Sequence, residues 1–440
     1  MKTVEPYFAG IILKHYSLNS HKENAKLCYD FLNILKGAFM KNLGKRAFLT
    51  RAVHAGERVP LGKHTPVATP IHPSVGYFYE SMENLDAAFE GRQEGYVYLR
   101  YGSPTVAAFE TAVAELEQGE ACQAFSSGMA AIHTALLAAG VRAGTTVVTT
   151  LDLYGATTIL LQRLFTEMGV TVRLVDLADP GALRAILADK RPVALLIETI
   201  SNPLMKVADI PPLVTLAHQY GTKVLVDNTF ASPYLFNPLV HHTDFVIHSI
   251  TKYIGGHGDV MGGVVISSAE NRKRLNDLNR LVGGALGPFE AWLALRGCKT
   301  LPLRVREQCA NAARIAEWLT EHPKIERVNY PGLPNDPQHE LARRLFEGRG
   351  FGGMLSFEIA GADRAAIFRF MDSLELCLPA PTMGDLYTLV LHPATASHRG
   401  LSIEERAKAG IREGLVRMSV GIEDVRDIIA DIEQSLAALQ

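Results

Sequence analysis

Short apolar stretches alternate with helical patterns between residues 120 and 270. The apolar stretches are rich in β-branched residues and almost uninterrupted, a pattern typical of strands covered on both faces. They lie at 145–150, 172–177, 193–199, 223–229 and 245–248. The helical patterns between them lie at 127–139, 156–168, 180–188 and 210–220. This alternation predicts an α/β fold with a mostly parallel, doubly wound sheet.

The pattern changes after a long amphipathic helical stretch at about 291–319. Strand patterns at 352–360 and 417–423 are then separated by a helical pattern and a polar loop region. The helical pattern covers 363–373, the loop covers 382–402, and a terminal helix covers 425–439. We therefore expect a smaller C-terminal α+β domain.

Composition narrows the class of protein. The 440 residues are 48% hydrophobic and 20% charged, with a net charge of −2, so neither nucleic acid nor an anionic membrane is indicated as a partner. No apolar run approaches the roughly 20 residues that a membrane span needs. The five cysteines have no CxxC spacing, which argues against a disulfide framework or a zinc site and favours the cytoplasm. They are Cys28, Cys122, Cys298, Cys309 and Cys377.

The first 47 residues form a separate, basic segment. They contain no uninterrupted apolar stretch followed by a small-residue cleavage site, as a secretory signal would. A transit peptide would contain fewer acidic residues than Glu5, Glu23 and Asp30, and more arginine. We interpret residues 1–47 as an appended extension of unassigned function.

Polar residues gather where the predicted parallel strands end, which is where such sheets bind ligands. They are Glu198, Asp227, Asn228, Thr229, Ser249, Thr251 and Lys252. Lys252 has two interpretations. Its stem packs while its ammonium reaches water, or it is a desolvated nucleophile that forms a Schiff base. The hydroxyls before it and the glycines after it favour a bound phosphate nearby, and hence the second interpretation.

A Schiff-base lysine beside a phosphate site suggests pyridoxal phosphate, whose ring nitrogen a carboxylate keeps protonated. Asp227 is suitable, although an aspartate in a DNT sequence equally suits a turn or cap. The sequence FSSGMAAI places Ser127 and Gly128 at a helix start, where backbone N–H groups bind phosphate, or where serine is an ordinary cap. Tyr154 follows a strand and either stacks on a flat ring or packs in the core.

These motifs together resemble the Cys/Met-metabolism family of pyridoxal-phosphate enzymes. The stretch DFVIHSITKYIGGHG at 244–258 resembles the family signature, and the likeness extends over about residues 48–440. The other motifs, in order, are YLRYGSPT, SSGMAA, LYGAT, ETISNP, VDNTFASP, PFEAWLALRGCKTL, NYPGLP, GGMLSFE, HPAT-SH and GLVRMSVGIED.

The resemblance implies a role for each matching residue. Lys252 resembles the Schiff-base lysine and proton shuttle, Asp227 the partner of the ring nitrogen, and Tyr154 the stacking tyrosine that also exchanges protons. The expected phosphate and ring contacts are Gly128, Met129, Asn202, Thr229, Ser249 and Thr251. Tyr98 and Arg100 resemble the pair that reaches the neighbouring subunit's phosphate. On the substrate side are Arg417, similar to the clamp on the substrate carboxylate, Thr382 and, again, Tyr98.

The resemblance also implies a fold and an assembly. The fold is the large aspartate-aminotransferase-like type (fold type I), with a seven-stranded, mostly parallel sheet and a smaller C-terminal domain. We expect an arm at 48–108, a large cofactor domain at 109–295 and a substrate-side domain at 296–440. The implied assembly is a homotetramer of two catalytic dimers, in the cytoplasm.

A few positions bear on the substrate. Typical methionine γ-lyases of bacteria carry cysteine where Ala156 stands, which weakens that assignment without excluding it. Cystathionine enzymes usually carry glutamate where Pro381 stands. A proline cannot pair with the distal ammonium of cystathionine. The hypothesis is therefore γ-elimination from methionine or a related sulfur amino acid, giving a 2-oxo acid, ammonia and a thiol. The alternatives are an O-acylhomoserine sulfhydrylase, then a cystathionine γ-lyase or γ-synthase. A nicotinamide dehydrogenase is disfavoured because no GxGxxG follows an early strand.

Overall fold

The structure is a computed structural model that describes residues 43–59, 64–400 and 402–439. Its contacts divide the chain into two units, Met1–Arg46 and Ala47–Gln440. Most of the predicted extension, residues 1–42, lies outside the described residues. The described part of the first unit contains one 3-10 turn, η1 (Leu43–Lys45). All that follows concerns the second unit.

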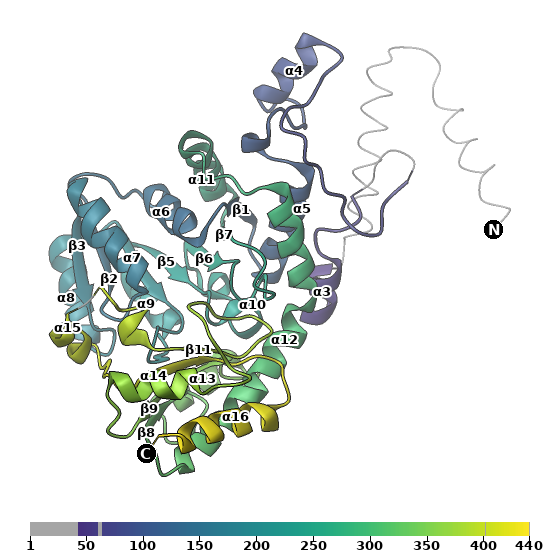
Figure 1. The fold of residues 1–440 in the computed structure, drawn as a ribbon. Helices are drawn as coiled ribbons and strands as arrows, with labels where there is room; N and C mark the ends of the chain where they lie inside the picture. Colours follow the sequence, from purple (N-terminus) through teal and green to yellow (C-terminus); the bar gives the residue numbers. More distant parts are fainter. Residues whose placement is uncertain (1–42, 60–63, 401, 440) are drawn as a thin grey trace. The chain divides into compact units, whose positions relative to one another are not determined.

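A seven-stranded sheet forms the centre of the larger part (Figure 1). Its strands are β1 (Ala121–Phe125), β2 (Thr146–Thr150), β3 (Thr171–Val175), β4 (Ala194–Glu198), β5 (Lys223–Asp227), β6 (Phe245–Ser249) and β7 (Gly263–Ser267). They lie in the order β1-β7-β6-β5-β4-β2-β3, and the pairs from β6 through β3 are parallel. β7 runs antiparallel to both of its neighbours. The predicted α/β class and mostly parallel sheet are confirmed.

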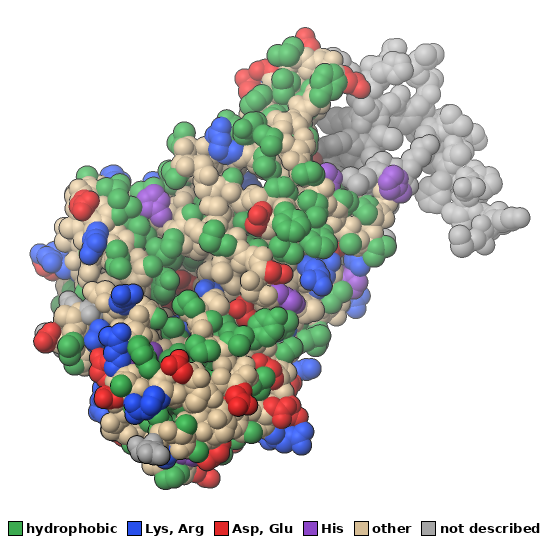
Figure 2. All heavy atoms as spheres, viewed as in Figure 1, with side chains coloured by type: hydrophobic (Ala, Val, Ile, Leu, Met, Phe, Trp, Pro, Cys, Tyr) green, Lys and Arg blue, Asp and Glu red, His purple; other side chains and the backbone are tan. Residues whose placement is uncertain are grey.

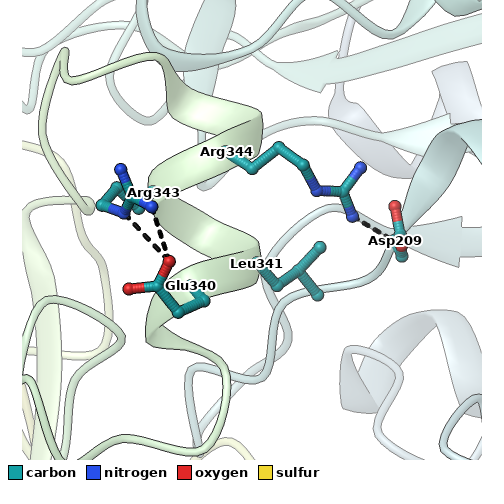
Figure 3. Close-up of a pocket in the computed structure, with 5 residues that line it drawn as sticks. All are labelled: Asp209, Glu340, Leu341, Arg343 and Arg344. Carbon is teal, nitrogen blue, oxygen red and sulfur yellow. Dashed lines mark hydrogen bonds and ion pairs between the residues drawn. The ribbon is translucent and has the colours of Figure 1, made fainter.

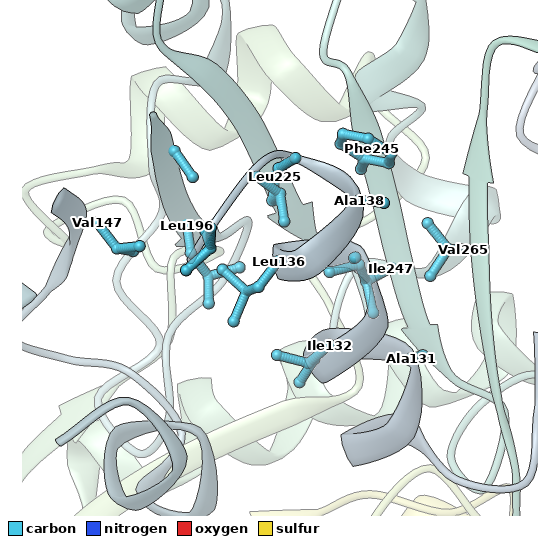
Figure 4. Close-up of a cluster of buried hydrophobic side chains, with 14 of the residues drawn as sticks. Ala131, Ile132, Leu136, Ala138, Val147, Leu196, Leu225, Phe245, Ile247 and Val265 are labelled. Atoms are coloured by element: carbon cyan, nitrogen blue, oxygen red, sulfur yellow. The ribbon is translucent and has the colours of Figure 1, made fainter. Parts of the chain in front are cut away.

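Helices pack against this sheet because their apolar residues recur every three to four positions. The longer ones are α5 (Pro104–Leu116), α6 (Gly128–Ala138), α8 (Pro180–Lys190), α9 (Ile210–Gln219) and α11 (Ala269–Val282). Shorter ones are α10 (Ser232–Leu235) and η4 (Pro238–His241). Figure 4 shows how Ile132 and Leu136 of α6 face strand residues such as Leu225 and Ile247, all of them buried. This core holds α6 and the carboxyl ends of the strands in fixed relation.

The predicted helix at 156–168 is only partly α-helical. It begins as α7 (Gly155–Ile159) and continues as a π-helical turn, η3 (Leu160–Phe165). π-helical turns often occur near functional sites, and this one is separated from Tyr154 only by the five residues of α7.

The smaller part is built on a five-stranded sheet in the order β10-β11-β12-β9-β8. Its strands are β8 (Ile325–Asn329), β9 (Met354–Ile359), β10 (Leu378–Pro379), β11 (Leu389–Leu391) and β12 (Leu415–Ser419). Its helices are α12 (Pro288–Glu321), α13 (His339–Phe346), α14 (Arg364–Asp372), η5 (Pro393–Thr395), α15 (Ile403–Lys408) and α16 (Val425–Ala437).

Two expectations for this part need comment. The region 382–402 is not all loop, because β11 lies within it; three buried residues are too short a run to stand out among polar ones. The boundary predicted at 295/296 falls inside α12, and the predicted domain boundaries stay predictions.

Residues 47–103 form a segment with short helices. These are α3 (Phe48–His54), α4 (Met82–Phe89) and the 3-10 turn η2 (Leu99–Tyr101). α4 contains no buried residue although Met82 and Phe89 lie on it. Across the described residues, no helix combines the length and apolar character that a membrane span requires.

Candidate active site

Lys252 lies in a tight turn directly after β6. Its ammonium Nζ donates a hydrogen bond to Oγ1 of Thr382, 3.0 Å away, from the smaller part of the chain. Arg304 of α12 anchors the turn by donating a hydrogen bond to the carbonyl of Tyr253 at 2.8 Å. Burial, and secondarily the charge of Arg417, lowers the pKa of Lys252, while Asp385 opposes the shift. A lysine with a lowered pKa is more nucleophilic at neutral pH.

Two carboxyl groups stand side by side where β4 and β5 end. Glu198 and Asp227 are register partners on adjacent parallel strands, so their side chains point to the same face. Asp227 accepts hydrogen bonds from the backbone N–H of Thr229, at 3.0 Å, and from its hydroxyl. Burial raises the pKa of Asp227, and these two bonds oppose the rise. The hydroxyl of Thr229 also accepts from the backbone N–H of Ser249, at 2.9 Å, which ties β5 to β6.

The start of α6 closes against Ser249. A side chain at Gly128 would place its Cβ 2.9 Å from Cβ of Ser249, so only glycine permits this approach. The approach brings the start of α6 at Gly128 beside the Ser249 hydroxyl, whose oxygen would lie 3.1 Å from such a Cβ. Thr251 is differently placed, because its hydroxyl accepts from the backbone N–H of Gly262 at 3.2 Å. Helix N–H groups beside a serine hydroxyl are suited to a phosphate.

Arg417 of β12 is the basic group of the smaller part at this site. It is 5% exposed and donates to Oδ1 of Asn202, at 3.2 Å, and to the carbonyl of Thr382, at 3.0 Å. Burial lowers its pKa to about 10, which leaves it charged at neutral pH. Its Nε has no hydrogen-bond partner among the described residues. A guanidinium with an unused donor can still bind a carboxylate.

Tyr154 stands at the start of α7 with its ring 41% exposed. Its backbone N–H donates to Oε1 of Glu198 at 2.9 Å. The position is close enough to Arg417 for the two side chains to interact electrostatically. The ring is therefore exposed rather than packed in the core, which favours the stacking interpretation.

Tyr98 and Arg100 do not join this cluster within the described contacts of one chain. Arg100 donates to the carbonyl of Arg280 in α11 at 2.6 Å, and its guanidinium lies 5.5 Å from the centre of the Tyr98 ring. Tyr98 is 43% exposed.

Three residues at the site carry features that the sequence interpretation left unassigned. Glu198 was recognised only as a polar residue at a strand end. Asp385 is buried and its charge acts on Lys252, yet this aspartate, which follows Gly384, belongs to none of the motifs named above. His398 is 6% exposed and lies near Arg417; burial is the main cause that lowers its pKa to about 4. The HPAT-SH motif contains His398, but its burial was not predictable.

The residues present are compatible with pyridoxal phosphate. A desolvated lysine, a partly satisfied carboxylate and free helix N–H groups match the aldehyde, ring nitrogen and phosphate of that group. Nε of Arg417 and Oε2 of Glu198 are among the buried polar atoms that have no hydrogen-bond partner in the described residues. Among the described residues, no three His, Cys, Asp or Glu side chains are close enough to hold a metal ion.

A separate surface pocket lies between α13 and the start of α9 (Figure 3). It is lined by Asp209, Glu340, Leu341, Arg343 and Arg344, with Arg344 paired to Asp209 at 2.8 Å. No residue predicted for the site lines it. The pocket is open and its charges are already paired, so we assign it no function.

Comparison with known proteins adds independent information. Residues 49–437 match the family described as Cys/Met metabolism PLP-dependent enzyme. An L-methionine γ-lyase of Fusobacterium nucleatum subsp. polymorphum is 42% identical over 88% of this chain and 97% of its own length. An O-succinylhomoserine sulfhydrylase of Pseudomonas aeruginosa is 41% identical over 92% of this chain and 98% of its own.

The fold matches a solved structure equally well. The cystathionine γ-synthase of Xanthomonas oryzae pv. oryzae, in complex with aminoacrylate and cysteine, superposes with a TM-score of 0.84. The two chains are 37% identical, and the match covers 90% of this chain and 98% of the other.

Proposed function

The chain belongs to the Cys/Met metabolism family of pyridoxal-phosphate-dependent enzymes, and we propose that it is a γ-lyase for methionine or a related sulfur amino acid. The family, the fold type and the cofactor that were expected from the sequence are confirmed. The proposed products are a 2-oxo acid, ammonia and a thiol.

The observation that carries the proposal is the connection made by Thr382. Its hydroxyl accepts from Lys252 and its carbonyl accepts from Arg417, both at 3.0 Å. A group that exchanges protons is thereby held at a fixed distance from a group that binds a carboxylate. This arrangement suits a substrate with an α-carboxylate next to the carbon that loses a proton.

Each residue then has a definite task. When bound, the cofactor supplies a conjugated ring that accepts the electron pairs released at Cα and Cβ of the substrate. Arg417 holds the substrate carboxylate, and Lys252 carries protons at Nζ between the substrate carbons. The Tyr154 hydroxyl would exchange a proton with the departing sulfur. Asp227 would hold the proton on the ring nitrogen, while Gly128, Met129 and Ser249 would contact the phosphate. Thr251 would join them only if its hydroxyl gave up its bond with Gly262.

The choice of substrate rests on the loop that begins at Pro381. Pro381 is exposed and Thr382 is neutral, so this loop offers no carboxylate to a second ammonium group at that position. Methionine has an apolar thioether there, whereas cystathionine has a charged amino acid. Relatives named as methionine γ-lyases, at about 40% identity and nearly full length, support the same substrate class.

Product analysis tests the proposal. Purified enzyme is incubated separately with methionine, with cystathionine, and with O-acetylhomoserine plus sulfide. We expect 2-oxobutyrate and a thiol from methionine at the highest rate. Homocysteine from the ester, without breakdown of methionine, would overturn the proposal in favour of a sulfhydrylase.

That second candidate is favoured by one specific observation. Ala156 stands in α7, beside the proposed acid–base residue Tyr154, where methionine γ-lyases carry a cysteine. The 41% identical sulfhydrylase of P. aeruginosa shows that the overall similarity is nearly equal for γ-replacement. Ala156→Cys is the matched variant. Under the γ-lyase proposal it should raise methionine breakdown relative to homocysteine formation.

We also propose that the enzyme is a homotetramer of two catalytic dimers. Among the contacts of the described residues, Tyr98 and Arg100 touch none of the other site residues of their own chain, which suits a role in a neighbouring subunit's site. Apolar side chains are strongly exposed on the same segment, among them Phe78 at 93% and Met82 at 73%. Figure 2 shows hydrophobic side chains on the surface of the part that carries α4. Such exposure is typical of an interface surface.

Subunit mixing tests this assembly. Arg100→Ala and Lys252→Ala chains, each inactive alone, should regain part of the activity when they are mixed and reassembled, because hybrid dimers contain one intact site. Light scattering should give four times the 48.1 kDa chain mass. A monomer that is active at all concentrations would contradict the proposal. The cytoplasmic location stays a prediction, in keeping with free, buried cysteines at 122, 298, 309 and 377.

A further inference from the structure

Glu198 is a buried acid to which the proposed function gives no role. It ends β4 with 8% of its surface exposed. Its register partner on β5 is Asp227, so two carboxyl groups share one face at the same edge of the sheet. Burying two adjacent ionised carboxylates is unfavourable, because their repulsion is screened weakly in a low-dielectric interior.

The contacts of Glu198 lead to the loops that carry proposed cofactor contacts. Oε1 accepts the backbone N–H of Tyr154 at 2.9 Å. The carboxyl group also faces the backbone N–H of Asn202. Oε2 is buried without a partner among the described residues. One side chain therefore lies between the loop after β2 and the loop after β4.

The charged surroundings decide which of the two acids is ionised. Asp227 accepts two hydrogen bonds from Thr229, and the positive potential of His248 acts on it. Glu198 faces Asp227 and Asp152, both of them acids, and Asp152 is itself paired with Lys206 at 2.7 Å. Burial first, and then the charge of Asp227, raises the pKa of Glu198 well above its usual range.

We propose that Glu198 is a positioning residue that stays protonated, holds the Tyr154 loop through its backbone N–H, and leaves the negative charge at this edge to Asp227. The inference rests on the proposed cofactor contacts of Tyr154 and Asp227, but not on the identity of the substrate. A neutral acid still accepts a hydrogen bond on its carbonyl oxygen while adding no charge beside Asp227.

The test compares Glu198→Gln with Glu198→Ala in the holoenzyme. Glutamine has the shape of the neutral acid and keeps the acceptor for Tyr154, whereas alanine removes it. The measurements are the visible circular dichroism of the bound cofactor, the pH midpoint of its absorption band, and the rate of cofactor release. We expect Glu198→Gln to keep the wild-type dichroism and midpoint. We expect Glu198→Ala to lose dichroism and to release cofactor about tenfold faster, the equivalent of one lost hydrogen bond.

Glu110 provides a matched control. It is also 8% exposed and its Oε1 also accepts one backbone N–H, that of Ala124 at 2.8 Å, but it lies on α5 and its Oε2 is paired with Arg272 at 3.2 Å. Glu110→Ala should lower thermal stability and leave the visible dichroism unchanged. A general packing defect would instead affect both alanine variants alike.

Two results would overturn the inference. A Glu198→Gln midpoint displaced from the wild type would show that Glu198 is ionised in the native enzyme. Wild-type dichroism in Glu198→Ala would show that Glu198 does not position Tyr154. If Glu198→Ala fails to fold, the midpoint of Glu198→Gln still decides the protonation state. Failure of the methionine assay leaves these readouts untouched, so the two proposals fail separately.

Discussion

Strands β4, β5 and β6 carry polar side chains on both faces near their carboxyl ends, and the two faces differ in how these groups are satisfied. On one face Glu117 pairs with His248 and accepts from Asn228 at 3.1 Å. Asn228 in turn accepts from the Thr199 hydroxyl at 2.7 Å. On the other face Glu198 and Asp227 stand beside each other without a cationic partner in hydrogen-bond contact among the described residues.

The difference distinguishes polar groups that stabilise the fold from polar groups that are available to a ligand. Successive residues alternate in direction, so Thr199 and Asn228 point away from Glu198 and Asp227 although they are their chain neighbours. The Glu117–His248 network satisfies its charges internally, which is what a buried network needs in order to stabilise a fold. The Glu198–Asp227 face leaves donors and acceptors unused. Unused buried groups cost free energy, so a ligand that satisfies them is the physical reason for their presence.

The largest effect on activity is expected for Lys252→Ala, at the candidate active site. Activity should fall by on the order of 10⁴-fold or more, because the proposed nucleophile and proton carrier is removed. The visible absorption band of the bound cofactor should disappear. Urea unfolding of the cofactor-free protein should change little, since Lys252 contributes one hydrogen bond. Lys190→Ala, at an exposed lysine, is the control.

A substitution in the Glu117–His248 network should have the opposite effect, lowering stability while leaving cofactor binding intact. His248→Ala leaves the buried Glu117 without this hydrogen-bond partner, which should lower the free energy of unfolding by about 3 kcal/mol. Cofactor binding by the folded fraction should persist. A double-mutant cycle with Glu117→Ala should give a large coupling energy, because the two groups are in direct contact. A small cost for either single change would remove the contrast between the faces.

His398, on the site side of the molecule, should make the free energy of unfolding depend on pH. Its pKa in the folded protein is lowered to about 4, below the roughly 6.5 of an unperturbed histidine. The unfolded chain therefore takes up a proton first, so stability is full above about pH 6.5 and is lost as the pH falls to about 4. The loss should reach about 3 kcal/mol. His398→Gln should flatten this part of a plot of unfolding free energy against pH; an unchanged slope would assign the dependence to other groups.

The smallest effect is expected for Arg417→Lys. Lysine keeps the charge but cannot form two parallel hydrogen bonds with a carboxylate. KM should rise by about 10–100-fold, corresponding to roughly 1.5–3 kcal/mol, with a smaller change in kcat. Stability should be nearly unchanged, which distinguishes this site residue from His248. A large loss of kcat with normal KM would argue against a substrate clamp.

Much of the larger part was predictable because its strands are nearly uninterrupted apolar runs that differ clearly from the helices between them. β7 was missed because it directly follows several glycines, although Gly263–Ser267 is as long as the other strands of its sheet. β11 was missed because it is only three residues long and lies in a polar region. The π-helical turn after α7 has no signature in the apolar pattern, which is the same for both kinds of helix over so few residues.

By itself, the sequence determined the α/β class, the family and the cofactor, because these depend on local motifs such as the turn around Lys252 and the DNT triplet at Asp227. The tertiary structure decided which distant groups meet. Thr382 reaches Lys252 across 130 positions, and Asn202 reaches Arg417 across 215. It also decided that Glu198 contacts the Tyr154 loop and that the polar groups of β4–β6 divide between two faces. Those facts follow from strand register and from the packing of the smaller part on the larger, which no stretch of chain encodes alone.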